Sequence, residues 1–392
     1  MMTSYYKSVS MVLVLLMGCS NNTKSSYQDP AKDDGVTIHQ ENKPQTLAAQ
    51  RISLPSITEL LTKRHHKIDP VITKDFILSF ENDALVVTDI HTSTVYKKLN
   101  DFKVLVAPVM SDNKIILSTS QKGLVVLSWP NLEMMYEKKL EAPLLTSPLV
   151  LENGDIFIQY IHNIAELITP ELNLYWRVTL QNFSQYYQES AYSPCADEHA
   201  IYLSFPGNGI VSLDRKNGMM RWNYRGFVEI AGLTHNGLGQ KQVFHPLNVL
   251  SDTLVSKISD GTIHLLDKDT GMVKTVLEAT AETPILIDKQ HLYYVDSENA
   301  MICYHLDERK QMWRNTSIDM PISSLQHMDA NRIIANAVLP HLYLIDAQEG
   351  MLLQHFVHQF HQARLLSSQD NDTIYGIDKF GIFFKLNSEK FS

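Results

Sequence analysis

The sequence has little of what most enzymes and nucleic-acid-binding proteins display. Its 392 residues include only three cysteines, and its 43 acidic residues outnumber its 34 basic ones, which leaves a net charge of −9. A protein that neutralises phosphates needs the opposite balance, so nucleic-acid binding is not expected. The sequence also has no P-loop, no G-x-S-x-G, no H-E-x-x-H and no haem-attachment C-x-x-C-H motif.

One apolar stretch near the N-terminus stands apart from the rest of the chain. The segment VSMVLVLLMG follows Lys7 and is too short to span a bilayer, which is typical of a signal-peptide core. It ends in LMGC, which resembles the bacterial lipobox, in which the cysteine becomes the first mature residue and is acylated. We therefore expect a signal peptide over residues 1–18 and a lipid anchor, such as palmitate, on Cys19. Ser20 implies, by the same resemblance, delivery to the outer membrane. A plain secretory signal is the alternative.

The next residues lack any apolar period. Residues 19–45 are polar and are expected to form a flexible tether, whereas residues 46–392 are expected to form the folded domain. The two remaining cysteines, Cys195 and Cys303, lie far apart and show no metal-ligand spacing. Buried free thiols are the expected state, although a periplasmic location would permit a disulfide.

Internal repeats dominate the remainder of the chain. Prolines that open apolar segments recur at intervals of about forty residues. A strand-like run after each proline is followed in several units by an aspartate and a polar turn that ends in glycine, as at Asp214 and Gly218, Asp267 and Gly271. The recurring prolines are Pro70, Pro108, Pro148, Pro194, Pro246, Pro284 and Pro321.

A second position recurs with the same spacing near the end of each unit. It is occupied by an aromatic residue in five units and by Thr275 and Gln354 in two more. Four short antiparallel strands every forty residues are typical of a propeller blade, so the sequence predicts an all-β, eight-bladed β-propeller. The aromatic residues are expected to pack between blades. They are Tyr96, Tyr136, Trp176, Trp222 and Trp313.

The eighth unit is incomplete. Residues 363–392 supply only three strand-like segments, and a three-stranded last blade would leave an exposed edge. We expect residues 46–55 to provide the fourth strand of this blade and so to close the ring.

The repeat resembles a known superfamily. The segment GIVSLDRKNGMMRW, Gly209 to Trp222, is similar to the repeat of quinoprotein-dehydrogenase-like (PQQ-repeat) propellers. Within that superfamily, the lipobox, the polar tether, the eight blades and the length resemble the BamB-like propeller lipoproteins of the outer-membrane β-barrel assembly machinery. This resemblance implies a non-enzymatic scaffold without a cofactor, anchored in the outer membrane and facing the periplasm. It implies as partner a central barrel subunit with periplasmic domains.

Two other functions remain open. One is a propeller lipoprotein of another envelope or secretion complex, and the other is a quinone- or sugar-acting propeller enzyme with its site in the central channel. The adjacent cysteine pair that holds the quinone in such enzymes is missing. No metal is expected at His355, His358 and His361, because residues three apart on a strand point to opposite faces.

Two insertions are the candidate partner-binding segments. They lie between Trp176 and Pro194 and between Trp222 and Pro246, on either side of the fourth blade. Loops of repeat proteins often bind, and aromatic and arginine side chains are favoured at interface centres. The candidate residues are Phe183, Tyr186, Tyr187, Arg225 and Phe227. The alternative is that these loops only pack across a propeller face.

The lipobox yields the first testable expectation. Replacing Cys19→Ala removes the thiol that would be acylated, so the protein should move from the membrane pellet to the soluble periplasmic fraction. Fractionation and palmitate labelling measure this. A Cys19→Ala protein that still pellets with outer membrane and takes up label as the wild type does would contradict the lipoprotein interpretation.

Overall fold

The chain divides into two compact units, residues 1–33 and 34–392, and the described residues lie in the second. The computed structural model describes residues 36–38, 45–46, 50–51, 68, 70–81, 83–161, 163–180, 192–205, 209–225, 243, 245–280, 285–358, 364–366, 373–377 and 383–387. These residues form strands, turns and bends, and they contain no helix.

The strands form eight sheets, one for each predicted repeat. Blade 1 contains β4 (Val71–Ile72), β5 (Phe76–Glu81), β6 (Ala84–Asp89) and β7 (Val95–Leu99). Blade 2 contains β8 (Val109–Ser111), β9 (Lys114–Thr119), β10 (Gly123–Ser128) and β11 (Met134–Lys138). Blade 3 contains β12 (Leu149–Val150), β13 (Ile156–Gln159), β14 (Ile164–Ile168) and β15 (Leu174–Thr179). Blade 4 contains β16 (Cys195–Ala196), β17 (Ala200–Phe205), β18 (Gly209–Asp214) and β19 (Met220–Tyr224).

The remaining blades follow the same plan. Blade 5 contains β20 (Asn248–Leu250), β21 (Thr253–Lys257), β22 (Thr262–Asp267) and β23 (Val273–Glu278). Blade 6 contains β24 (Leu286–Asp288), β25 (His291–Val295), β26 (Met301–His305) and β27 (Lys310–Asn315). Blade 7 contains β28 (Ile322–His327), β29 (Arg332–Ala337), β30 (His341–Asp346) and β31 (Leu352–Val357). Blade 8 contains β32 (Arg364–Leu366), β33 (Thr373–Ile377) and β34 (Phe383–Asn387).

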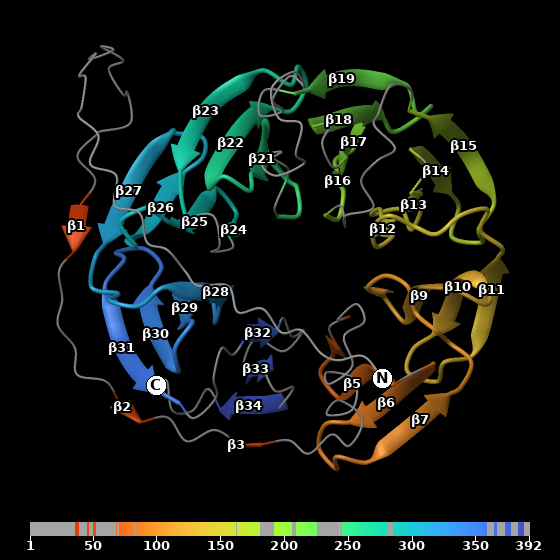
Figure 1. The fold of residues 1–392 in the computed structure, drawn as a ribbon, viewed down its shortest axis with the longest axis horizontal. Coiled ribbons are helices and arrows are strands. Elements are labelled where there is room, and N and C mark those ends of the chain that lie inside the picture. The colour runs from red at the N-terminus through yellow and green to blue at the C-terminus, as the bar shows by residue number, and fades with distance from the viewer. Residues whose placement is uncertain are drawn as a thin grey trace, which may run out of the picture. The chain divides into compact units, whose positions relative to one another are not determined.

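Within each blade the strands lie side by side in chain order, from the first strand at the centre of the ring to the last at its rim (Figure 1). From β4 to β34, neighbouring strands within a blade are antiparallel. The prediction of an all-β, eight-bladed propeller with four-stranded antiparallel blades is therefore confirmed. Pro108, Pro148, Pro194 and Pro321 each directly precede the first strand of a blade, where the missing N–H leaves no ladder bond unmade.

Residues from the N-terminal region complete the eighth blade. The short strand β3 (Gln50–Arg51) pairs antiparallel with β34, Gln50 opposite Lys385 and Arg51 opposite Phe384. It lies inside the segment expected to close the ring, and it gives blade 8 its fourth strand. A hydrophobic cluster of Ile72, Ile77 and Ile90 with Leu366, Tyr375 and Ile377 joins blade 1 to blade 8.

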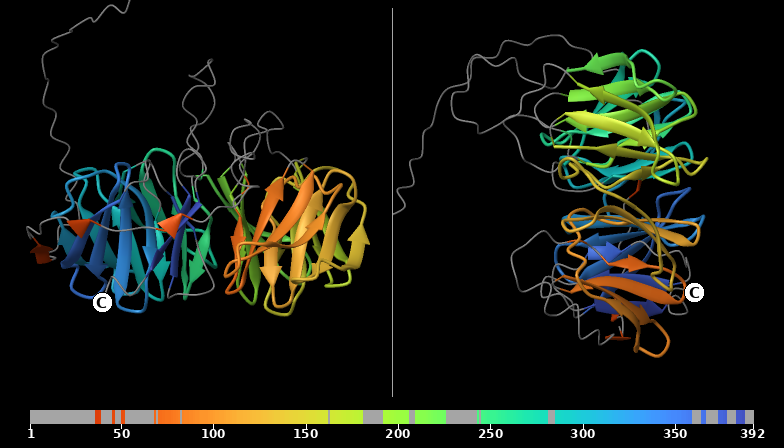
Figure 2. Two further views of the ribbon diagram at one scale, coloured as in Figure 1. Left: turned by 90° about the horizontal axis from the view of Figure 1, so that it is seen from below. Right: turned by 90° about the vertical axis from the view of Figure 1, so that its right-hand side faces the viewer.

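The segment expected to be a flexible tether contains additional strands. β1 (Val36–Ile38) pairs in parallel with β27, and β2 (Gln45–Thr46) pairs in parallel with β31. Blades 6 and 7 thus have five strands, and Figure 2 shows β1 and β2 outside the rim of the ring. Since the outer strand of a blade offers unpaired backbone groups, a polar segment without an apolar period can also pair there.

Three blade junctions contain a tryptophan that contacts the next blade. The indole Nε1 of Trp176 donates to the carbonyl of Arg215 at 2.9 Å, and Trp222 donates to Lys268 at 2.9 Å. In the same way Trp313 donates to Ala347 at 3.2 Å. Each acceptor directly follows an aspartate, in the turn between the third and fourth strands of the following blade. As predicted, these rings pack between blades, and each of them contacts that turn of the next blade.

The two tyrosines at the equivalent positions contact the next blade differently. Tyr96 is half exposed, and its hydroxyl donates to Asn131 Oδ1, 3.0 Å away in the corresponding turn of blade 2. Tyr136 is half-buried and packs against the hydrophobic cluster that joins blades 2 and 3. Tyr96 therefore reaches the neighbouring blade with less burial than Trp176 or Trp313, whereas Tyr136 and Trp222 are both half-buried.

The aspartate and the glycine of the repeat shape this turn. Asp267 Oδ1 accepts hydrogen bonds from the backbone N–H groups of Asp269 and Thr270, at 3.2 and 2.9 Å. The N–H of Gly271 donates to the Asp267 carbonyl at 2.8 Å, with φ of +72°. A Cβ at Gly271 would lie 2.7 Å from the ring of Trp222, so only glycine lets the indole lie against the backbone.

A pair of glycine substitutions tests this packing. Gly271→Ala should destabilise the protein by about 1–3 kcal/mol more than Gly154→Ala does, because only the former also forces the Trp222 ring to move. Gly154 is a matched control, since its φ is +85° and its Cβ would meet only Pro170 Cγ, at 3.3 Å. Denaturant unfolding of both variants measures the difference. Equal losses would show that backbone strain alone, and not the indole contact, requires the glycine.

Candidate interaction surface

The residues proposed from the sequence to bind a partner lie almost entirely outside the described residues. This applies to Phe183, Tyr186, Tyr187 and Phe227. Arg225 is described, and it lies exposed directly after β19, at the start of the second insertion. The structure therefore places only this one candidate, and the grouping of the five residues stays a prediction.

The strand directions still define two faces of the ring. Connections between blades leave from the ends of the fourth strands, such as β15 and β19. The turns between first and second strands and between third and fourth strands lie on the other face, because neighbouring strands are antiparallel. We call these the connection face and the turn face. Arg225 belongs to the connection face, and Gly218 and Gly271 belong to the turn face.

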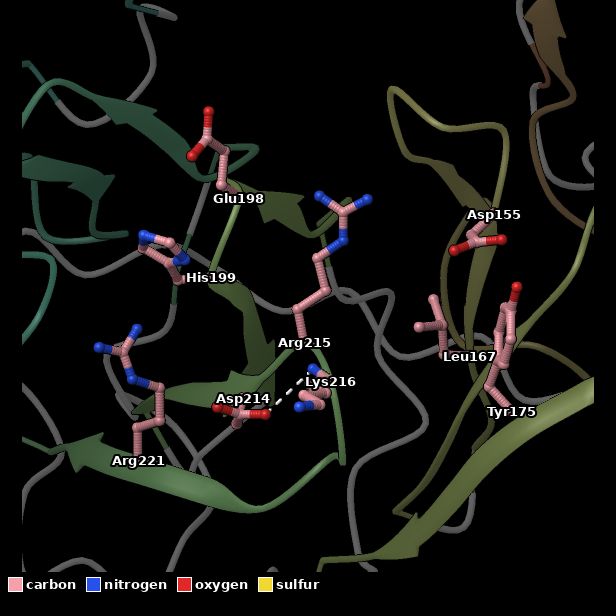
Figure 3. Close-up of a pocket in the computed structure, with 9 residues that line it drawn as sticks. All are labelled: Asp155, Leu167, Tyr175, Glu198, His199, Asp214, Arg215, Lys216 and Arg221. Carbon is pink, nitrogen blue, oxygen red and sulfur yellow. Dashed lines mark hydrogen bonds between the residues drawn. The ribbon is translucent and has the colours of Figure 1, made fainter.

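A pocket of about 550 Å³ opens on the turn face between blades 3 and 4. Asp155, Leu167 and Tyr175 of blade 3 line one side of it, and residues of blade 4 line the other (Figure 3). The blade 4 residues are Glu198, His199, Asp214, Arg215, Lys216 and Arg221. Acidic and basic side chains therefore line this pocket at the junction of two blades, and such a lining is suited to contact with the polar surface of another protein.

Arg215 connects the two sides of this pocket. Its carbonyl accepts the indole N–H of Trp176, and its Nη2 donates to Asn153 Oδ1 of blade 3 at 2.8 Å. Its Nη1 donates to the carbonyl of Asp197 at 3.3 Å. Because a planar guanidinium has several donors in a fixed arrangement, one side chain here holds two blades in register.

The equivalent residue of blade 5 forms an ion pair with blade 4. Lys268 Nζ lies 3.0 Å from Asp197 Oδ2, and the two side chains are only 21% and 15% exposed. Burial alone would raise the pKa of Asp197, but hydrogen bonds from the backbone N–H of His199 and from Lys268 outweigh it and hold the pKa at about 2. Asp197 therefore stays charged and adds a second contact to this junction.

The rim near the pocket carries exposed apolar side chains. Tyr175 is 58% exposed and also lines the pocket, and Met219 and Met272 are 67% and 70% exposed. The other exposed apolar residues on the outer strands of blades 2 to 5 are Met134, Met135, Leu174, Met220, Val273 and Val276. Methionine and tyrosine are enriched in protein interfaces, so this rim is suited to protein contact.

The histidines and cysteines singled out in the sequence do not converge. His355 bonds to His341, with 2.8 Å between the ring nitrogens, whereas His358 bonds to Asn336; His361 lies outside the described residues. Within the described ranges no three His, Cys, Asp or Glu side chains are grouped as a metal would require. Cys195 and Cys303 are free thiols. In the same part of the chain, no helix is long and apolar enough to cross a membrane.

The residue that follows the turn aspartate was not predicted from the sequence to join two blades. Arg215 and Lys268 both use the backbone carbonyl for the preceding tryptophan and the side chain for the preceding blade. The repeat does contain the pairs Asp-Arg and Asp-Lys. Their role in joining two blades can be inferred only once the contact with the preceding blade is known.

Solved structures support the fold. A crystal structure of BamB from Moraxella catarrhalis has a TM-score of 0.62 and 12% identity, and the match covers 88% of this chain and 99% of that one. The computationally designed Ika8 protein matches with a TM-score of 0.62 and 12% identity over 83% and 98% of the two chains. The C-terminal WD40 domain of Sif2 matches with a TM-score of 0.61 and 11% identity, and the match covers 88% of this chain and 99% of that one. At these identities the likeness shows a propeller and nothing finer.

These features define a β-propeller that is built from sequence repeats. A sequence profile of the family described as outer membrane protein assembly factor BamB matches residues 93–315, which is more than half of the chain. The chain belongs to this family, as the repeat had indicated. No curated protein sequence matches it significantly.

The Asp197–Lys268 pair leads to a pH-dependent prediction. The pKa of Asp197 in the folded protein lies below its ordinary value of 3.8. The contribution of the Asp197 carboxylate to the free energy of unfolding is therefore present above about pH 4 and is lost as the pH falls towards 2. Asp197→Asn should lower stability by about 2 kcal/mol at pH 7 and flatten the acid limb of the stability curve. Asp269→Asn is the control, because Asp269 also forms an ion pair, with Arg221, but is 56% exposed. Loss of this exposed ion pair should lower stability by less than about 1 kcal/mol. Equal effects in urea titrations from pH 2 to 7 would contradict the assignment.

Proposed function

We propose that this protein is a non-enzymatic lipoprotein of the outer membrane that faces the periplasm and assists the assembly of β-barrel outer-membrane proteins. The observation that carries the proposal is the family match over residues 93–315. The lipobox that ends at Cys19 supports it independently, because a barrel-assembly factor acts at the membrane to which that cysteine would be anchored.

The blade 3 to blade 5 region is the surface we propose for partner docking. Its rim exposes Tyr175, Met219 and Met272, and its two insertions carry the aromatic residues selected from the sequence. Interface energy is concentrated in a few aromatic and arginine anchors, which this region offers at high density. As partner we propose the central barrel subunit of the assembly machinery, through its periplasmic domains.

The two ring faces assign different roles within that surface. Arg225 lies at the connection face, whereas the polar pocket with Arg215 opens at the turn face. Arg215 is committed to contacts between blades 3 and 4. We therefore propose that the insertions supply the binding anchors and that the pocket residues hold the blades that carry them.

Replacing the anchors tests this function. The variant Tyr186→Ala/Tyr187→Ala/Arg225→Ala/Phe227→Ala should lose capture of the barrel subunit in a pull-down while its melting temperature stays unchanged. Single replacements should weaken binding by about 1–3 kcal/mol each, with non-additive sums. Val95→Ala is the control, because Val95 is an apolar rim residue of blade 1 that is 56% exposed.

Three outcomes separate the alternatives. Normal capture by the folded quadruple variant would remove the insertions as the docking site but leave the function intact. Reproducible capture of a different envelope or secretion complex by the wild type, with no barrel-assembly component, would replace the proposed function by that one. Loss of capture in Val95→Ala as well would show that binding is spread around the rim.

A further inference from the structure

The pocket between blades 3 and 4 contains polar side chains that take no part in joining the two blades. Four of its lining side chains have no hydrogen bond or ion pair within the described residues. They are Tyr175, Glu198, His199 and Lys216. All four are exposed, and Figure 3 shows the tyrosine on the blade 3 side of the pocket and the other three on the blade 4 side. The pocket therefore offers a phenol, a carboxylate, an imidazole and an ammonium group to a ligand.

A second, smaller pocket of about 270 Å³ opens on the turn face between blades 2 and 3. Asp112, Lys114 and Glu152 line it, and their side chains likewise have no polar partner in the part of the chain that the structure describes. Asp112 and Glu152 are exposed, and Lys114 is half-buried. Two successive blade junctions on one face of the ring therefore carry pockets with unpaired polar side chains.

One turn of blade 3 lies between these two pockets. It consists of residues 151–155, which connect β12 to β13. Asn153 and Gly154 of this turn line the smaller pocket, and Asp155 lines the larger one. Asn153 Oδ1 also accepts the hydrogen bond from Arg215 Nη2, which is 2.8 Å away in the lining of the larger pocket. Because this turn contributes to both linings, a chain-like ligand that is longer than one pocket can cross it and occupy both.

The unpaired charged groups of the two pockets have both signs. They are the carboxylates of Asp112, Glu152 and Glu198 and the ammonium groups of Lys114 and Lys216. An anionic ligand gains little from such a lining, because carboxylates outnumber ammonium groups. A hydroxyl group both donates and accepts hydrogen bonds, so a ligand rich in hydroxyl groups satisfies both kinds of side chain without a charge of its own. Tyr175 is 58% exposed and adds an aromatic face against which the C–H groups of a sugar ring can pack.

A polypeptide is less suited to these pockets than a sugar. An extended peptide is recognised through recesses that accept its side chains at alternate positions. Here the apolar lining residues Leu167, Ile116 and Ile156 are at most 4% exposed and offer little contact area. The surface of a folded protein also reaches less of a recessed lining than a small ring that enters the pocket.

We propose that the two pockets form a single binding site for a neutral oligosaccharide, with sugar rings in both pockets and the glycan chain crossing the turn at residues 151–155. The carboxylates accept hydrogen bonds from the sugar hydroxyls, the ammonium groups donate to them, and Tyr175 lies against one ring. This site goes beyond the barrel-assembly function and does not depend on it. It opens on the turn face, whereas Arg225 lies at the connection face.

Binding of the full chain in detergent to an array of neutral and acidic oligosaccharides of increasing length tests the proposal. We expect binding to at least one neutral series, with an affinity that rises with length because only longer members reach the second pocket. Glu198→Ala and Tyr175→Ala should each weaken binding of the best neutral member roughly tenfold, measured by calorimetry. Glu349→Ala and Val95→Ala are matched controls and should bind normally, because Glu349 is an exposed turn residue of blade 7 and Val95 is a 56% exposed rim residue of blade 1.

A further variant tests whether the two pockets act as one site. Asp112→Ala/Glu152→Ala should remove most of the gain in affinity with length, and an unchanged gain would overturn the joint site. No binding to any neutral oligosaccharide, or binding to acidic ones alone, would overturn the proposal, as would equal affinity of Glu198→Ala and Glu349→Ala. Binding of a capped peptide of alternating valine and threonine that is lost in Glu198→Ala would overturn it also, since the pockets would then be a polypeptide site. Melting temperatures of all variants verify that they are folded.

Discussion

The contact between a tryptophan and the turn of the next blade is the interaction on which the rest of this ring depends. Trp176, Trp222 and Trp313 each donate the indole N–H across a junction and lie against a glycine that has no side chain to keep the ring away. A blade alone leaves its faces uncovered, so the stability of the ring comes from these junctions as much as from the sheets. The hydrophobic clusters agree, because each of those found in the described residues contains side chains from two neighbouring blades.

The junctions are not identical, and the differences divide the surface. In blades 4 and 5 the residue after the turn aspartate is basic, and its side chain reaches back to Asn153 of blade 3 or to Asp197 of blade 4. At blade 7 the same position is Ala347, which has only its carbonyl to offer. Polar, charged junctions therefore lie beside the insertions proposed to bind a partner.

Much of the repeat could be read from residue types, but not all of its geometry. The sequence predicted the end of this turn only where it is glycine, as at Gly218 and Gly271, both of which have positive φ. Ser93 and Leu132 have positive φ at the same position, with the same bond from their N–H to the carbonyl four residues earlier. Neither residue type signals that conformation in a sequence, because tertiary packing imposes it on them. The sequence could predict the candidate partner-binding site only as a region of the chain. Residue types indicate which side chains favour interfaces, but not on which face of the ring they lie.

The sequence by itself determined the fold class, the number of blades and the positions of the joining aromatic residues. It could do so because the decisive contacts link residues 34, 39 and 46 positions apart, about one repeat length, so that they recur with the period of the chain. Only the tertiary structure decided which blade edges the N-terminal strands cover, where the pocket opens, and that Arg215 and Lys268 reach back to the preceding blade. Those features arise once, from ring closure and from residues far apart in the chain, and a pattern that occurs once leaves no period by which a sequence reveals it.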